Sequence, residues 1–363
     1  MNILFITPSD KTGGGNRVMF ELAARLSRRH RVTCAFPRSP GRPKYRIAPE
    51  IRTVAAGFGS EHKYSVLPNL LSLYGWLTAN KNGFDAIVST GQITGILLPY
   101  LRHRRLFNYI QSDEYAIMEQ GHLRGRPLLL GLYSRLMSRS LVSPGIRCLF
   151  NSEFSLRAFT SRHPGRGDPG AIIHPGVDAT VFRPALHRDG RAPLTIASLA
   201  RPHALKGLDV LLRAYRDLPA ETRAMARWRL ITTDDLQKCG VPGSFEIIRP
   251  QNDTELAGLL QQADIFLSTS LWEGFGLPAL EAMACGCAVV TSRNGGCDEY
   301  AVHGRNCLTY PPGDPAALAG HVQNLLGDSA LRSRLAAEGV RTARRFSWEA
   351  SAGRLLEILE GAP

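Results

Sequence analysis

Short apolar runs rich in β-branched and aromatic residues alternate with longer segments of helical periodicity along the whole chain. This alternation is typical of βαβ units, in which parallel strands form a sheet and helices cover its faces. The first half contains six such runs, at residues 3–7, 32–36, 86–89, 106–110, 148–151 and 171–174. The second half contains six more, at residues 194–197, 229–232, 245–248, 265–268, 288–291 and 307–308. Each set is sufficient for one doubly wound sheet, so the pattern predicts an α/β protein with two Rossmann-like domains.

Both periodicities break between the two sets of runs. A Pro/Gly-containing stretch at 174–184 and a polar stretch at 187–193 fit neither a strand nor a helix. We therefore expect an N-terminal domain at 1–174, a hinge at 175–192 and a C-terminal domain at 193–345. Ser347 can cap a last helix, and we expect residues 346–363 to form a C-terminal helix that packs back on the N-terminal domain.

The composition is that of a globular protein, with 44% hydrophobic and 21% charged residues. The chain runs from Met1 straight into a strand-like segment, and no apolar run approaches the roughly 18 residues of a membrane-spanning helix. These features lead us to expect a cytoplasmic protein. Most of the seven cysteines lie in apolar patterns, and Cys285-Gly-Cys287 lacks metal-ligand spacing, so we expect reduced core cysteines and no metal site.

The net charge of +13 is concentrated in the first half of the chain. Residues 1–184 hold 25 Lys+Arg against 11 Asp+Glu, which gives +14, and the remainder holds 19 against 20, which gives −1. Such a field favours an anionic ligand or an anionic membrane surface. It does not indicate a nucleic-acid partner, because the basic residues are not interleaved with aromatic ones and no recognised binding module is present.

The segment from Lys63 to Leu77 bears on the same question, because it carries apolar residues at helical spacing. These are Val66, Leu67, Leu70, Leu71, Tyr74 and Leu77. Such a helix either lies on lipid or faces the protein core, and an apolar stripe by itself does not distinguish the two.

The most informative stretch begins after the expected strand at 265–268. A glycine-containing loop, Gly274-Phe275-Gly276-Leu277, leads into a helix with Pro278 in its first turn. Backbone N–H groups at the start of a helix have no partners within the helix and can bind phosphate or sugar oxygens. The loop is therefore a candidate binding site for a phosphorylated ligand.

Two glutamates, Glu273 and Glu281, bracket this loop. The helical neighbours of Glu281 are apolar or small, which predicts a buried carboxylate that needs hydroxyl or N–H donors rather than a solvated side chain. Two cations precede the loop in the chain. Arg201 follows the expected strand at 194–197 and Lys206 precedes a helix, so both can reach a diphosphate at the domain cleft.

The glycines Gly13-Gly14-Gly15 follow the first expected strand. Alone they indicate either a phosphate-binding turn or only a tight turn. They lack the full dinucleotide-binding glycine spacing, and the second expected strand ends without an acid that could hold a ribose.

The segment from Glu273 to Glu281 is similar to the signature of glycosyltransferase family 4, in which two glutamates are separated by seven residues. Further matching segments follow in the family's order and span nearly the whole chain: 8–15 with 21–26, 151–153, 173–184, 198–201 with 206–207, and 295–299. The chain is identified by these matches as a member of that family. The resemblance implies the GT-B fold, in which two Rossmann-like domains face each other across a cleft.

The resemblance also implies a retaining hexosyl- or deoxyhexosyltransferase that uses a nucleotide-diphosphate sugar and needs no metal or other cofactor. Glu273 is expected to hold donor-sugar hydroxyls, Glu281 the ribose diol, and Arg201 with Lys206 the diphosphate. The backbone of 274–277 is expected to contact sugar and phosphate oxygens, and Gly14 and Gly15 the donor phosphates. The donor phosphate would help to deprotonate the acceptor in a front-side displacement.

One departure concerns the strand at 106–110. Many relatives carry a histidine followed by an acid after this strand, whereas this chain reads Tyr109-Ile-Gln111-Ser-Asp113-Glu114. Either Gln111 or Asp113 stands in for the histidine, or the loop only caps a helix. We take Asp113 as a fourth catalytic candidate beside Glu273, Arg201 and Lys206.

The expected acceptor is a lipid-linked or envelope polysaccharide intermediate, with peripheral contact at the inner face of the membrane through the basic first half. A small soluble natural product is the alternative acceptor. A nucleotide-sugar epimerase of the same fold is the alternative activity, and turnover without acceptor would reveal it.

Overall fold

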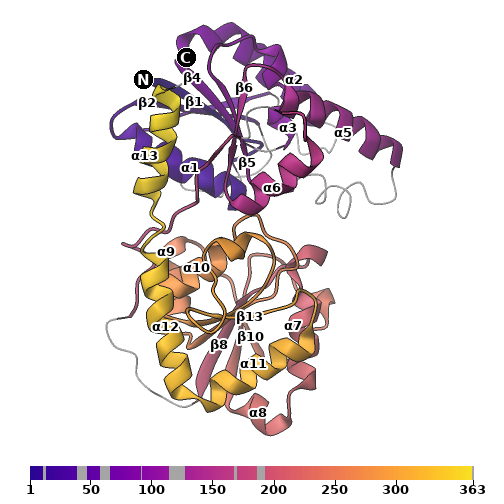
Figure 1. The fold of residues 1–363 in the computed structure, drawn as a ribbon, viewed down its shortest axis with the longest axis vertical. Helices are drawn as coiled ribbons and strands as arrows, with labels where there is room; N and C mark the ends of the chain where they lie inside the picture. Colours follow the sequence, from indigo (N-terminus) through magenta and orange to yellow (C-terminus); the bar gives the residue numbers. More distant parts are fainter. Residues whose placement is uncertain are drawn as a thin grey trace. The chain divides into compact units, whose positions relative to one another are not determined.

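The computed structural model describes residues 1–10, 14–38, 47–57, 66–90, 92–113, 127–166, 170–185 and 193–361. The chain divides into two compact units (Figure 1). The first unit consists of Met1–Pro175 together with Trp348–Pro363, and the second of Gly176–Ser347. Part of the expected hinge, residues 186–192, lies outside the described residues.

The first unit contains a parallel seven-stranded sheet of order β3-β2-β1-β4-β5-β6-β7. Its strands are β1 (Asn2–Ile6), β2 (Arg31–Pro37), β3 (Arg52–Ala56), β4 (Ala86–Thr90), β5 (Leu106–Ile110), β6 (Ile146–Phe150) and β7 (Ala171–Ile172). The order reverses between β1 and β4, which is where ligands bind in open α/β sheets. The edge strand β3 is absent from the sequence prediction. Its side chains are largely exposed, so it lacks the apolar run that marks a buried strand.

The described helices of the first unit are α1 (Gly14–Ser27), α2 (Val66–Asn80), α3 (Gln92–Gly95), α5 (Pro127–Val142), α6 (Glu153–Arg162) and α13 (Trp348–Glu360). The last of these is the C-terminal helix, and it packs against α1. Arg25 of α1 donates to Glu349 at 3.2 Å, and Ser351 donates to the carbonyl of His174 at 2.6 Å.

Helix α2 contains the described part of the apolar segment for which both lipid and the protein core were considered, whereas residues 63–65 are outside the described chain. Leu73 and Leu77 have no exposed surface and join a core cluster with Leu4 and Ile6 of β1. Tyr74 packs against the same cluster. Leu73, Tyr74 and Leu77 therefore lie on the core-facing side of α2, because the faces of a parallel sheet must be covered, whereas Leu71 is 61% exposed.

The second unit contains a parallel six-stranded sheet of order β10-β9-β8-β11-β12-β13. Its strands are β8 (Leu194–Leu199), β9 (Ala226–Ile231), β10 (Phe245–Ile248), β11 (Ile265–Ser268), β12 (Ala288–Ser292) and β13 (Leu308–Tyr310). All six overlap the predicted runs. The strand order reverses between β8 and β11, and these two strands position most of the candidate site.

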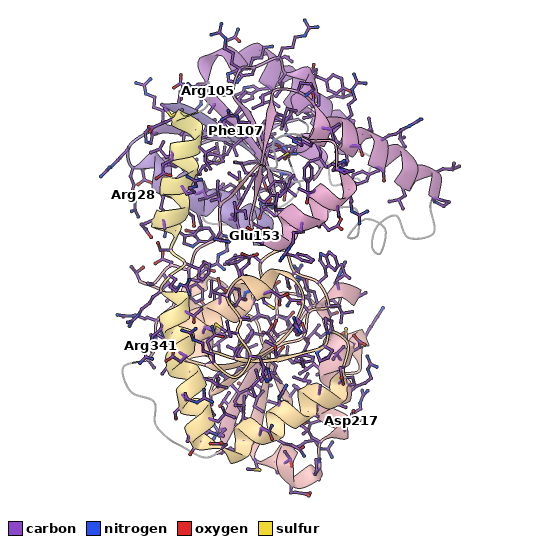
Figure 2. All side chains as sticks on the ribbon, viewed as in Figure 1. Arg28, Arg105, Phe107, Glu153, Asp217 and Arg341 are labelled. Atoms are coloured by element: carbon purple, nitrogen blue, oxygen red, sulfur yellow. The ribbon has the colours of Figure 1, made fainter. Side chains whose placement is uncertain are left out.

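The helices of the second unit are α7 (Leu208–Asp217), α8 (Ala220–Ala224), α9 (Asp253–Gln261), α10 (Leu277–Ala284), α11 (Pro315–Gly327) and α12 (Ser329–Ala343). Three of them begin at side-chain caps, since Asn252 accepts from the N–H of Glu255, Asp314 from that of Ala317 and Asp328 from that of Leu331. Apolar side chains fill the interior of each unit, and charged ones such as Arg28 lie at the surface (Figure 2). Within the described residues, no helix is long and apolar enough to cross a membrane.

Candidate active site

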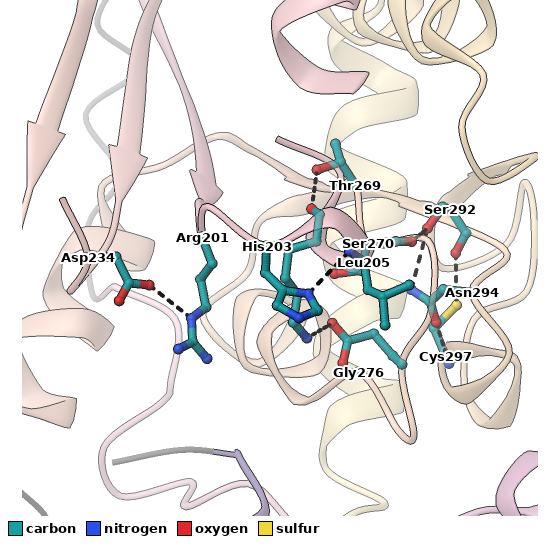
Figure 3. A network of polar contacts seen from close by, with 12 residues as sticks. Arg201, His203, Leu205, Asp234, Thr269, Ser270, Gly276, Ser292, Asn294 and Cys297 are labelled. Atoms are coloured by element: carbon teal, nitrogen blue, oxygen red, sulfur yellow. Dashed lines mark hydrogen bonds and ion pairs between the residues drawn. The ribbon is translucent and has the colours of Figure 1, made fainter. Parts of the chain in front are cut away.

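The loops that follow β8 and β11 are joined to each other at the carboxyl edge of the second sheet. The N–H of Leu271 donates to the carbonyl of Leu205 at 2.8 Å, and the hydroxyl of Thr269 donates to the carbonyl of Lys206 at 3.2 Å (Figure 3). Since β8 and β11 flank the reversal of strand order, these bonds fix the two loops where a ligand is expected.

Gly207 allows this close approach. Its φ of +61° lies in the left-handed region, and a Cβ placed on it would lie 2.0 Å from the carbonyl oxygen of Thr269. Only glycine fits such a position. The residue therefore sets both the contact between the loops and the start of α7.

Lys206 and Glu273 form a direct ion pair across the two loops. Lys206 Nζ lies 2.7 Å from Glu273 Oε1, and the two side chains are only 30% and 17% exposed. Lys206 ends a short 3-10 turn, η4 (Ala204–Lys206), in which the N–H of Leu205 donates to the His203 ring at 3.2 Å. The structure thus brings together a cation and a carboxylate that the sequence placed 67 residues apart.

Arg201 lies beside this pair in the same loop and has a carboxylate partner of its own. Its Nε donates to Asp234 Oδ2 at 3.0 Å, and its side chain is 54% exposed (Figure 3). Asp234 follows β9, the sheet neighbour of β8, and its N–H donates to Thr232. Our sequence reasoning missed Asp234. The available signal was its position just after a strand adjacent to the one that carries Arg201.

The glycine-containing loop is clamped between two further segments. Glu273 exchanges backbone hydrogen bonds with Asn294 and Gly296 at 3.1 Å each. A Cβ on Gly296 would lie 2.3 Å from the amide nitrogen of Phe275, so glycine is required for this contact. The Phe275 ring packs 5.6 Å from Tyr300. These contacts fix the position of the loop against residues 294–300.

Gly276 turns this loop into α10. Its φ is +84°, and its carbonyl accepts a hydrogen bond from the Tyr300 hydroxyl at 2.6 Å. Burial, followed by nearby acidic groups that include Glu273 and Glu281, raises the pKa of Tyr300 well above its ordinary value. Tyr300 consequently keeps its proton and acts as a permanent donor to the loop.

Glu281 lies in the middle of α10 and is 2% exposed, which confirms the predicted burial. The other residues of this helix are apolar, and all except Pro278 are buried. An ionised carboxylate in such surroundings is costly unless donors meet it. Glu281 therefore places a buried carboxylate in the helix that follows the glycine-containing loop.

In the first unit, Gly14 and Gly15 form the first turn of α1. The Gln111 amide nitrogen donates to the carbonyl of Gly15 at 3.0 Å and to the hydroxyl of Thr90 at 2.5 Å. Gly14 is exposed, and a Cβ on it would meet nothing within 4 Å. The described packing therefore gives no steric reason for a glycine at position 14.

Asp113 forms an ion pair away from this turn. Its carboxylate accepts from Arg162, the last residue of α6, at 2.8 Å and is 6% exposed. Of the two replacements considered for the family histidine, Gln111 contacts the glycine turn and Asp113 contacts α6. Glu114 lies outside the described residues.

The described residues contain no group of three or more His, Cys, Asp or Glu side chains arranged to hold a metal ion. Cations at the candidate site are instead supplied by Arg201 and Lys206.

Two family models match the chain. The model for glycosyl transferases group 1 covers residues 185–342, and the model for glycosyltransferase family 4 covers residues 12–181. Together they span both units.

Curated relatives extend these matches. The chain is 30% identical to the D-inositol 3-phosphate glycosyltransferase of Mycobacterium bovis over 385 residues, which cover 95% of this chain and 78% of that protein. It is 32% identical over 209 residues to the protein of the same name from Xylanimonas cellulosilytica, covering 52% and 50% of the two chains. The match thus spans only about half the length of that relative.

Among solved structures, sucrose-phosphate synthase from Thermosynechococcus elongatus is similar over 100% of both chains, with a TM-score of 0.83 and 19% identity. At this identity, the similarity concerns the fold.

Proposed function

Because the chain belongs to glycosyltransferase family 4 and has the GT-B fold, we propose that it transfers a sugar from a nucleotide-diphosphate sugar to an acceptor with retention of anomeric configuration. The observation that carries the proposal is the Lys206–Glu273 ion pair, held beside Arg201 and the start of α10 at the carboxyl edge of the second sheet.

This arrangement suits a donor with a diphosphate next to a sugar. The phosphate oxygens would accept from Lys206 and Arg201, and the sugar hydroxyls would donate to Glu273. The backbone of 274–277 would supply further N–H donors at the positive end of α10. Donor binding would thus replace a contact between two protein charges with two contacts to the ligand.

Glu281 is proposed to bind the ribose of the donor. A diol supplies two O–H donors, which can satisfy both oxygens of a buried carboxylate. Gly14 and Gly15 are proposed to offer backbone contacts to the donor phosphates.

The proposed reaction is a front-side displacement. The acceptor oxygen forms a bond to the anomeric carbon as the bond from that carbon to the diphosphate oxygen breaks on the same face. The acceptor proton passes to a phosphate oxygen of the leaving diphosphate. Lys206 and Arg201 would stabilise the charge that grows on the diphosphate, so we propose a reaction that needs no metal.

Asp113 is kept as the acidic candidate of the first unit. Through its ion pair with Arg162 it would act at a distance, by fixing α6, unless donor binding releases it. Gln111, in contact with Gly15, is the alternative candidate for the position of the family histidine.

The acceptor is proposed to be anionic, because residues 1–184 carry a net charge of +14. Our leading candidate is a lipid-linked or envelope polysaccharide intermediate, used by a cytoplasmic enzyme at the inner face of the membrane. The names of the curated relatives support a second candidate, a small phosphorylated polyol such as an inositol phosphate.

A thermal-shift panel of nucleotide sugars tests the donor assignment, since a ligand of the folded state raises the apparent stability. We expect one nucleotide sugar to raise Tm in the wild type and not in Glu281→Gln. Proton NMR of the product then gives the anomeric configuration, with EDTA present throughout. An inverted product, a strict need for Mg²⁺, or turnover of donor without acceptor would each contradict part of the proposal.

A further inference from the structure

We propose that an exposed apolar and basic face of the first unit, formed by α5 and the neighbouring turn η3 (Leu98–Tyr100), docks on an anionic lipid membrane. This inference rests on the proposed function in its membrane-associated form, and it identifies the surface that contacts the membrane. This docking face is defined by six residues: Leu128, Leu132, Leu136, Arg135, Arg139 and Tyr100.

The leucines of the docking face follow one stripe of α5. Leu128, Leu132 and Leu136 are spaced four residues apart, which places them on one side of the helix, and they are 89%, 57% and 37% exposed. Water-exposed leucines at three successive turns differ from the single exposed apolar residues that any surface carries.

The opposite side of α5 is fixed to the first unit. Met137 and Leu141 are buried in a core cluster with Phe150, and the Ser140 hydroxyl donates to the carbonyl of Gly95 at 2.5 Å. All of these anchors lie in the C-terminal half of the helix. In Figure 1 one end of α5 extends beyond the rest of the first unit. The C-terminal half of α5 thus anchors the helix, and Leu128 and Leu132 lie in the half before these anchors.

The charges beside this stripe identify the partner. Arg135 and Arg139 are exposed on the same helix, and α5 contains no acidic residue. The Arg139 guanidinium lies 5.5 Å from the ring centre of Tyr100, which is 43% exposed. Leucines that enter the acyl region, arginines that meet lipid phosphates and a tyrosine at the boundary are the combination that binds an anionic membrane surface.

Helix α2 lies next to this face and extends it. The Tyr74 hydroxyl donates to the carbonyl of Tyr100 at 3.3 Å, and Leu71, three residues earlier in α2, is 61% exposed. The exposed large apolar residues described in the second unit are Met225, Ile247 and Val302, which lie on separate elements and form no stripe. The docking face is therefore a property of the first unit.

Flotation of the full-length protein with vesicles tests the proposal. With vesicles of 70% phosphatidylcholine and 30% phosphatidylglycerol at about 0.1 M salt, where surface charges are only partly screened, we expect the wild type to float. It should not float with pure phosphatidylcholine. Leu128→Ser/Leu132→Ser and Arg135→Glu/Arg139→Glu should each reduce partitioning by about 10-fold or more. The matched controls Met225→Ser/Val302→Ser and Arg227→Glu, which alter exposed residues of the second unit, should float as the wild type does.

Equal binding to neutral and anionic vesicles would overturn the docking face, and so would anionic binding that the leucine and arginine variants retain. Self-association of the wild type that the leucine variants abolish would overturn it in favour of a second copy. Circular dichroism confirms that each variant is folded. Donor-induced stabilisation, measured on the same samples, separates the two proposals. If vesicle binding fails while donor binding persists, only the docking face is wrong; if the reverse holds, only the proposed transfer reaction is wrong.

Discussion

The carboxyl edges of the two sheets share a topology and differ in chemistry. In the second unit this edge carries two cations, each in contact with a carboxylate: Lys206 with Glu273 and Arg201 with Asp234. In the first unit the described side-chain contact of Gly15 is with the neutral amide of Gln111, which also donates to the Thr90 hydroxyl, and the Asp113–Arg162 ion pair lies away from this turn. The two cations of the second edge are thus paired with carboxylates, whereas the described contact to the glycine turn of the first edge is neutral.

Glycines reveal the same difference. Gly207 and Gly296 in the second unit are required by the fold, because a Cβ on either would collide with neighbouring backbone. Gly14 in the first unit has open space around its Cβ position. The two glycines of the second unit are therefore required by its own packing, whereas the described packing of the first unit makes no such demand at position 14.

The largest effect is expected from Glu281. Replacement by Ala or Gln should weaken donor binding by about 100-fold or more, because an uncharged or absent side chain no longer accepts both diol hydroxyls. Glu281→Gln preserves the shape of the side chain and so separates binding from folding. Isothermal titration with the nucleotide sugar chosen by the thermal-shift panel measures the change, with the exposed Glu221→Ala as control. Wild-type affinity in both Glu281 variants would remove this residue from the site.

Two glycine substitutions, one in each unit, test directly whether the glycines of the two units have different roles. Gly207→Ala should lower the free energy of unfolding by about 2–4 kcal/mol, because it combines a left-handed φ with a clash against Thr269. Gly14→Ala should leave stability within about 0.5 kcal/mol and weaken donor binding instead. Urea unfolding and titration calorimetry provide the two measurements. Equal effects of both substitutions on stability would show that the glycines do not differ as described.

The cations of the second unit should act mainly on the transition state. Lys206→Ala should lower kcat by about 100-fold, and the more exposed Arg201→Ala by about 10-fold, with smaller changes in KM. The charge on the departing diphosphate is larger in the transition state than in the bound donor, which is why kcat should respond more strongly. Steady-state kinetics with EDTA present measure both constants. Full turnover of either variant would contradict its assigned role.

Asp234 provides a finer test of the same edge. Asp234→Asn keeps a side chain of the same shape and removes the charge that orients Arg201, so kcat should fall by about 3- to 5-fold. In Arg201→Ala the substitution should have no further effect, since its partner is gone. A double-mutant cycle on kcat measures this coupling. Independent effects of the two substitutions would place Asp234 outside the pair.

Much of the second unit, including most of its candidate site, was predictable from the sequence. All of its strands carry apolar runs, and Lys206, Glu273 and Glu281 occupy strand-end or helix positions that local patterns define. Asp234 was missed because its role depends on the adjacency of β8 and β9, which strand order sets and local sequence does not.

The first unit was less predictable from the sequence, because its side-chain contacts also depend on packing that local sequence does not set. The pairing of Asp113 with Arg162 is a long-range contact between a loop and α6. The leucines of α5 show the same periodicity as a core helix, and only the packed structure reveals which side is covered. Strand β3 lies at an exposed sheet edge and lacks the apolar run of the interior strands.

The smallest expected effect is a decline in stability at low pH, and we expect it in both units. Burial lowers the pKa of His163 in the first unit, reinforced by Arg166 and Arg162, and burial also lowers the pKa of His321 in the second. Well above pH 6.5, the ordinary histidine pKa, each of these histidines is neutral in both the folded and the unfolded chain. Its burial then costs no free energy of unfolding. As the pH falls through 6.5 the unfolded chain takes up protons first, so stability should decline toward the lower pKa of the folded state.

Calorimetry between pH 7.5 and 5.5 should show Tm falling by about 2–4 °C for each unit that unfolds separately. His163→Asn should flatten the profile of the first unit and His321→Asn that of the second, whereas unchanged profiles would show that neither histidine controls this decline.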